Sequence, residues 1–207
     1  MSASRSPGAK ILKLSRRDHQ RESTRQRLFE AAIAEFRRVG FANAQIDDIV
    51  GAAGVARGTF YFHFPTKEHV LVEFQRRSQE NIVDRLAALR PRRLAVKSFL
   101  QSLIDAVIAE SVSSGQPSLQ RELFALFARR PAALEEQDYP LQEAVTQFFS
   151  EAQQRGEVRS DLMPAELTMI FLTSMFGVLL SQPDTLGPEL RSSLRRVIDV
   201  FVRGVAP

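Results

Sequence analysis

The sequence predicts an all-α protein, and three observations carry this prediction. Apolar residues recur at helical spacing along nearly the whole chain of 207 residues. Alternation of apolar and polar residues, which would indicate strands, never extends beyond a few positions. Pro or Gly separates most of the helical segments, which is typical of short links between helices.

Composition excludes several classes of protein. The chain has no cysteine, so it can form no disulfide, thiolate zinc site or cysteine nucleophile. The longest apolar stretch, residues 169–180, is shorter than the roughly 20 residues of a membrane-spanning helix. The opening residues MSASRSPGAK lack the apolar core of a secretory signal. We therefore expect a cytoplasmic protein without a membrane partner.

Charge is concentrated near the amino terminus. Residues 1–27 hold eight Lys or Arg and two acids, a net charge of +6, so the other 180 residues carry −2 of the total of +4. Residues 1–18, with few apolar anchors, are predicted to be a disordered basic arm. Such an arm either contacts a polyanion, along a groove or the backbone of DNA, or is a solvated tail.

The first helix is predicted over residues 24–39. Ser23 followed by Gln26 matches a capping box, in which each side chain bonds to the other's backbone N–H. Gly40 then ends the helix as a left-handed cap.

Two short helices follow, predicted over residues 45–53 and 57–62. Gly54 lies between them, and a glycine there can take a positive φ without a Cβ clash. Two short helices joined by a tight glycine turn form a helix-turn-helix. Pro65 ends this region.

The segment GVARGTFYFHF, residues 54–64, then divides into two faces. Phe60 and Phe64 are four residues apart and share the inward side of the helix. Arg57, Thr59 and Tyr61 are left facing outward from the first turn, which in a helix-turn-helix enters the major groove of DNA. A guanidinium can bond to guanine or phosphate there.

Residues 24–74 resemble the DNA-binding domain of TetR-type transcriptional regulators without a gap. The matching pieces, in order, are the Gly-Phe after the first helix, Asp-Ile, Ala-Ala-Gly-Val, Arg-Gly-Thr-Phe-Tyr, His-Phe and Pro-Thr-Lys-Glu. The resemblance implies an N-terminal three-helix helix-turn-helix DNA-binding domain, residues 19–66. It also implies a C-terminal helical domain for ligand binding and dimerisation, residues 67–207.

The resemblance further implies DNA contacts at ten positions. Arg57, Gly58, Thr59 and Phe62 would line the groove, Gln45 would approach the backbone or a base, and the others would bind phosphate. The ten residues are Thr24, Arg25, Gln45, Arg57, Gly58, Thr59, Tyr61, Phe62, His63 and Lys67. The chain departs from the family pattern at Ala44 and Ala56, where hydroxyl residues that cap helices are usual, and at Val50-Gly51.

The rest of the chain is predicted to be helical over residues 67–89, 94–111, 119–129, 132–137, 141–155, 165–181 and 189–203. In the resembling family such helices enclose an apolar cavity. Candidate pocket residues are aromatic, apolar or sparsely polar: Phe74, Ser78, Phe99, Leu103, Phe124, Phe148, Thr173 and Phe176. The last two helices are implied to form a dimer interface through Phe171, Met175, Val178, Leu194, Ile198 and Phe201.

Together these features predict a DNA-binding regulator, a repressor that binds a pseudo-palindromic operator as a homodimer and is released by a small apolar or aromatic effector. The alternative is a small-molecule-binding or protein-interaction module without specific DNA binding. The three histidines show no zinc spacing, and no nucleotide fingerprint or catalytic constellation is present. We expect no metal, no cofactor and no enzymatic activity.

Overall fold

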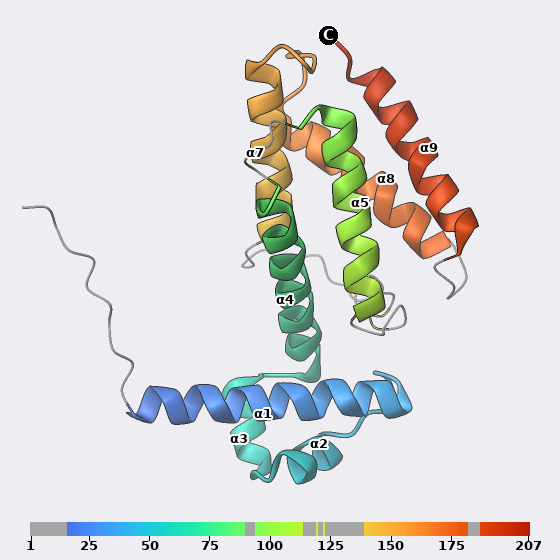
Figure 1. The fold of residues 1–207 in the computed structure, drawn as a ribbon. Coiled ribbons are helices and arrows are strands. Elements are labelled where there is room, and N and C mark those ends of the chain that lie inside the picture. Colours follow the sequence, from blue (N-terminus) through green and yellow to red (C-terminus); the bar gives the residue numbers. More distant parts are fainter. Residues whose placement is uncertain (1–15, 90–93, 114–118, 120–121, 123–138, 182–186) are drawn as a thin grey trace, which may run out of the picture. The chain divides into compact units, whose positions relative to one another are not determined.

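The computed structural model describes residues 16–89, 94–113, 119, 122, 139–181 and 187–207 (Figure 1). Its helices are α1 (Arg16–Val39), α2 (Ile46–Ala53), α3 (Arg57–His63), α4 (Lys67–Ala87), α5 (Val96–Ser113), α7 (Pro140–Gln154), α8 (Pro164–Ser181) and α9 (Pro188–Gly204). No strand occurs among these described residues, so the all-α prediction is confirmed. The predicted helix over 132–137 lies outside the described residues, as does 119–129 apart from Leu119 and Glu122.

The chain divides into two compact units, Met1–Lys67 and Glu68–Pro207. In the first unit α1 packs on α2, and α2 packs on α3. Their buried side chains are apolar, with Leu28, Phe36, Ile49, Phe60 and Phe64 all at most 2% exposed. A buried Leu or Phe contributes about 1.5–3 kcal/mol relative to an exposed one. This small core therefore fixes the angle between the short helices.

Helix α1 begins at Arg16, eight residues before the predicted start. The predicted capping box is wrong, because Ser23 lies inside the helix and Gln26 donates instead to Glu30 at 2.7 Å. Arg, Gln and Glu are good helix formers and carry the helix back toward the amino terminus. Residues 16–18, predicted to be disordered, are thus helical, and residues 1–15 lie outside the described part of the chain.

Two glycines set the corners of the first unit. Gly40 has φ of 81° and Gly54 has φ of 64°, and both conformations are unfavourable for residues with a Cβ. At the second corner the N–H of Val55 bonds to the carbonyl of Val50 at 3.1 Å. The predicted left-handed caps at both glycines are confirmed.

Within residues 16–89, neither Gln45 nor Ala56, the N-cap residues of α2 and α3, makes a side-chain capping hydrogen bond. A capping side chain typically contributes about 1 kcal/mol. The two short helices therefore depend on their apolar contacts for stability.

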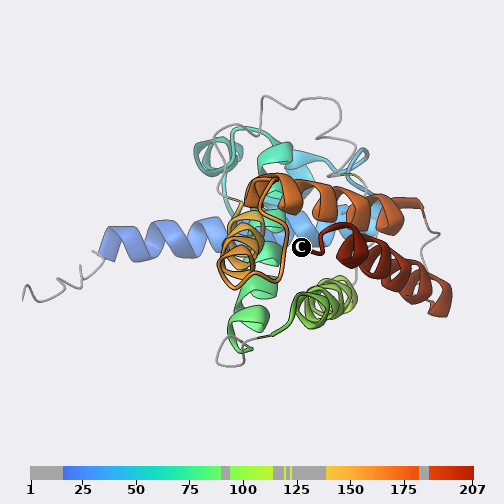
Figure 2. The ribbon, with the colours of Figure 1, turned by 90° about the horizontal axis from the view of Figure 1, so that it is seen from above.

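In the second unit α7 packs on α8, α8 on α9, and α5 on α9. Figures 1 and 2 show α8 and α9 side by side in both views. The rings of Phe149 and Phe171 lie 5.7 and 5.1 Å from that of Phe201, all three in the interior. This aromatic cluster ties the last three helices together.

Candidate DNA-binding interface

One side of the short helix α3 presents polar and aromatic groups to solvent. Arg57 and Gly58 are exposed, Thr59 is half-buried, and Tyr61 and Phe62 are 42% and 66% exposed. Phe60 and Phe64 lie on the opposite side and are buried, as predicted. The division of α3 into a core face and an outward face is therefore present in the structure.

Arg57 is held by an acid of the neighbouring helix. Its Nη1 donates to both carboxylate oxygens of Asp47, at 2.7 and 2.9 Å, and its guanidinium lies 6.0 Å from the centre of the Tyr61 ring. Both side chains of the pair are more than half exposed, so the pair contributes only about 0–1 kcal/mol. It positions Arg57 without holding it tightly.

Asp47 was not identified as a site residue from the sequence. It lies in the first turn of α2 with Asp48, where acids stabilise a helix through its dipole. Its position ten residues before Arg57, on the first helix of the helix-turn-helix, is the signal that could have identified it.

Helix α1 contributes cations to the same region. The guanidinium of Arg21 lies 5.1 Å from the centre of the Phe62 ring, and that of Arg25 lies 4.5 Å from the Phe64 ring. Arg21 was missed by the sequence reasoning, although it stands one helical turn before Arg25. Thr24 lies between them in mid-helix, where its hydroxyl donates to the carbonyl of Gln20 at 2.9 Å. It does not stand at the start of a helix as predicted.

His63 is half-buried at the end of α3. Burial lowers the pKa of its imidazole, and the positive charges of Arg21 and Arg25 lower it further. The ring is therefore neutral near pH 7 and can offer one N–H to an anion.

Lys67 begins α4, as predicted, and its side chain reaches back to the loop before α2. Its ammonium donates to the carbonyls of Phe41, Ala42 and Ala44, at 2.8, 3.2 and 3.2 Å. Lysine has three N–H donors, and the loop between α1 and α2 uses all of them. Lys67 therefore closes that loop in the structure, and its contact with a phosphate stays a prediction.

Gln45 is exposed at the start of α2, close to the predicted contact region. Its Nε2 donates to the carbonyl of Asn43 at 3.1 Å, and this bond does not use the side-chain oxygen. Gln45 therefore stays a predicted contact.

The predicted pocket residues do not form a single site. Phe99 and Phe148 stack with ring centres 3.6 Å apart and line one cavity of about 280 Å³. Thr173 and Phe176 line another cavity of about 180 Å³. Leu103, Phe74 and Ser78 are buried and line neither cavity, and Phe124 lies outside the described residues.

Most residues predicted at a dimer interface lie in the interior of the protomer. Phe171, Met175, Leu194, Ile198 and Phe201 are all at most 9% exposed. Phe171, Met175, Leu194 and Ile198 therefore expose almost no surface to a second chain. Phe201 and the half-buried Val178 line a groove between α8 and α9, and their place at an interface stays a prediction.

Two family models match the chain in consecutive segments. Residues 28–74 match the model of bacterial regulatory proteins of the tetR family, and residues 93–207 match the C-terminal domain of SbtR-like transcriptional regulators. The second match alone covers more than half of the chain. The chain belongs to the TetR family of transcriptional regulators.

The described residues contain no cluster of three or more metal-binding side chains.

Curated relatives and solved structures agree with this family. The HTH-type transcriptional regulator UidR of Escherichia coli K12 is 28% identical over 76% of this chain and 81% of its own length. The HTH-type transcriptional repressor DhaR of Mycobacterium sp. GP1 is 28% identical over 77% and 82%. Thermus thermophilus FadR, a TetR-family repressor solved with lauroyl-CoA, shares the fold with a TM-score of 0.74 at 23% identity, over 87% of this chain and 94% of that one.

Proposed function

We propose that this chain is a cytoplasmic repressor that binds a pseudo-palindromic operator as a homodimer and is released by a small apolar or aromatic effector. The exposed side of α3 is the observation that carries the DNA-binding part. A free protein gains nothing by exposing Tyr61 and Phe62 beside Arg57, whereas base edges and phosphates match all three groups.

Each group of this turn has a DNA partner of matching chemistry. The guanidinium of Arg57 bonds to guanine or phosphate, the hydroxyls of Thr59 and Tyr61 bond to phosphate, and Phe62 contacts thymine methyls or sugars. Gly58 lets the backbone approach closely. Arg21 and Arg25 of α1 add positive charge beside the ring faces of Phe62 and Phe64.

The outer faces of α8 and α9 supply the surface for a second copy. Ile170 is 50% exposed and Val200 is 74% exposed, and both line the groove of about 590 Å³ that also contains Val178 and Val197. Among the described helices, α8 alone is long and apolar enough to cross a membrane, judged only by length and composition. Pairing with a second protomer would cover its exposed apolar residues instead.

The relatives support the repressor assignment. DhaR is named a repressor, and the FadR structure is that of a repressor with a bound ligand. A dimer suits a pseudo-palindrome because two recognition helices then reach two half-sites one or more helical turns apart.

The test is selection of bound fragments from genomic DNA with the purified protein, followed by affinity measurements at several salt concentrations. Recovery of a site with twofold symmetry, together with log affinity that falls steeply with log salt, is the expected result. Weak binding that ignores both sequence and salt would favour the alternative, a ligand-binding or protein-interaction module without specific DNA binding.

A further inference from the structure

Helix α1 contains about three turns that the match to the family model does not cover. The helix begins at Arg16, whereas the match to the tetR-family model begins at residue 28. Residues 16–27 form a stretch of helix roughly 18 Å long at about 1.5 Å per residue. Helix α1 therefore extends past α3 at its amino end (Figure 1).

Three arginines of this stretch share one face of the helix. Arg17, Arg21 and Arg25 follow one another at four-residue spacing. The guanidinium of Arg21 lies 5.1 Å from the centre of the Phe62 ring, and that of Arg25 lies 4.5 Å from the centre of the Phe64 ring. The face with the three arginines is therefore turned toward α3, and Arg17 stands about 6 Å beyond Arg21 along the helix axis.

The ring of Phe62 positions the guanidinium of Arg21 at the surface. A ring face attracts the positive charge but offers no oxygen to the N–H groups. Phe62 is 66% exposed, and both Arg17 and Arg21 are exposed. Arg21 is thus held beside the exposed side of α3 by a contact that suits a guanidinium whose N–H groups bond to a phosphate.

Positive charge dominates this stretch of α1. Residues 16–27 hold five arginines and two acids, a net charge of +3. Like charges four residues apart destabilise a helix, and the row of Arg17, Arg21 and Arg25 contains two such pairs. A polyanion beside the row would replace that repulsion with attraction.

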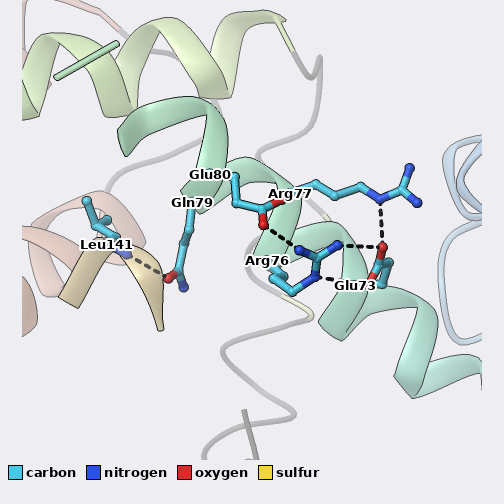
Figure 3. A network of polar contacts seen from close by, with 6 residues as sticks. All are labelled: Glu73, Arg76, Arg77, Gln79, Glu80 and Leu141. Atoms are coloured by element: carbon cyan, nitrogen blue, oxygen red, sulfur yellow. Dashed lines mark hydrogen bonds and ion pairs between the residues drawn. The ribbon is translucent and has the colours of Figure 1, made fainter. Parts of the chain in front are cut away.

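The arginines of α4 show the opposite arrangement (Figure 3). Arg76 bonds to Glu80 and, at 3.0 Å, to Glu73, and Arg77 bonds to Glu73 at 2.8 Å. Each of these cations has an acid one turn away, so residues 73–80 carry no net charge. Such pairs stabilise a helix by themselves, whereas the row of arginines on α1 needs an anion from outside the helix.

We propose that Arg17 and Arg21 form a second DNA contact, to phosphates of the backbone beyond those that α3 meets in the major groove. The inference rests on the proposed function and assigns the two arginines to affinity rather than to sequence preference. Phosphate contacts strengthen binding to every duplex alike and carry no sequence information directly. Because α1 extends past α3, this contact lengthens the stretch of backbone that each protomer covers.

The double variant Arg17→Gln with Arg21→Gln removes both charges and retains good helix formers. We expect its affinity for the selected operator and for random DNA to fall by the same factor, on the order of tenfold or more at low salt. The slope of log affinity against log salt should become shallower by about 3 to 4, because a dimer loses four phosphate contacts. A slope equal to that of the wild type would overturn the proposal.

Two further double variants separate a contact from an effect of net charge. Arg191→Gln with Arg195→Gln removes two exposed arginines of α9 at the same spacing and should leave the slope unchanged. Arg17→Lys with Arg21→Lys keeps both charges and should keep most of the slope, because lysine also binds phosphate. An equal loss of slope in the α9 variant would assign the effect to net charge and contradict the contact.

Methylphosphonate substitutions, which neutralise one phosphate of the selected operator at a time, locate the contact. Neutralising a phosphate bound by Arg17 or Arg21 should weaken binding of the wild type but not of the double glutamine variant. The sensitive positions should differ from those found with Tyr61→Phe. A scan in which no position behaves this way would overturn the proposal.

The same measurements separate this inference from the proposed function. If the protein selects an operator with a steep salt slope but the double glutamine variant matches the wild type, this inference fails and the repressor stands. If the wild type selects no operator and ignores salt, the proposed function itself fails.

Discussion

The two units differ in where their charged side chains find partners. In the first unit the partners lie on other elements: Asp47 of α2 holds Arg57 of α3, and the carbonyl of Ala53 accepts from Arg27 of α1 at 3.1 Å. On α4 of the second unit the partners lie within one helix, where Glu73 accepts from Arg76 and Arg77. The first pattern joins the helices that carry the proposed DNA-binding surface, whereas the second stabilises one helix by itself.

The largest expected effect concerns the surface that joins two copies. The double substitution Ile170→Asp and Val200→Asp places charges in the exposed apolar groove of α8 and α9. We expect a monomer by light scattering and a loss of operator affinity of about 100-fold or more, because two linked half-sites bind far more tightly than one.

The control for that experiment is Val112→Asp, which changes a valine of α5 whose exposure lies between those of Ile170 and Val200 and should leave both properties unchanged. A double variant that stays dimeric would place the interface elsewhere on the second unit.

The next effect concerns Arg57 and its partner. Arg57→Ala should weaken operator binding by about 1–3 kcal/mol and, if the residue reads a base, relax the preference at one position. Asp47→Asn removes the competing carboxylate and should raise affinity for random DNA more than for the operator. Gel-shift titrations on both DNAs measure each change. If Arg57→Ala binds the operator with the affinity of the wild type, the exposed side of α3 is not the recognition surface.

A smaller effect is expected from Lys67→Met, which removes three hydrogen bonds to the loop after α1. The free energy of unfolding should fall by about 1–2 kcal/mol. Lys97→Met is the matched control, because the one partner of that ammonium among the described residues is Asp199, at 2.7 Å, and both side chains are about half exposed. Pairs of this kind contribute little. If Lys67→Met is as stable as wild type but binds every DNA weakly, the original phosphate prediction holds after all.

The smallest effect concerns His63. Its pKa is lowered in the folded protein by burial and by Arg21 and Arg25, so the unfolded chain takes up a proton first as the pH falls. Stability should therefore decrease as the pH drops below about 6.5, the ordinary value for histidine. Chemical denaturation at a series of pH values measures this slope, and His63→Asn should flatten it. An unchanged slope in the variant would assign it to other groups.

The helix-turn-helix could be predicted closely because glycine and proline residues mark the ends of its helices. Gly40 and Gly54 adopt the positive φ that ends a helix, and Pro65 restricts its own φ and lacks an N–H. The ends of α2 and α3 therefore fall within a residue of their predicted positions. The start of α1 was wrong because a capping pattern at Ser23 was outweighed by the helix formers before it.

Contacts between distant residues could not be predicted in the same way. The three carbonyls that hold Lys67 belong to a loop more than twenty residues earlier, and no spacing pattern reports such a bond. Helix α8 is apolar on nearly every side, so its periodicity could not show that Phe171 and Met175 face inward while Ile170 faces out.

The ion pair between Asp47 and Arg57 also bears on the speed of recognition. Because both groups are solvated, separating them costs little free energy. The guanidinium can then pass from carboxylate to phosphate and back with a small barrier. At any register in which Arg57 finds no good acceptor, it stays paired with Asp47 and adds little to the attraction for the DNA backbone. A protein built this way would leave wrong sites quickly and spend its time on few of them, which shortens the search for an operator among a large excess of other DNA.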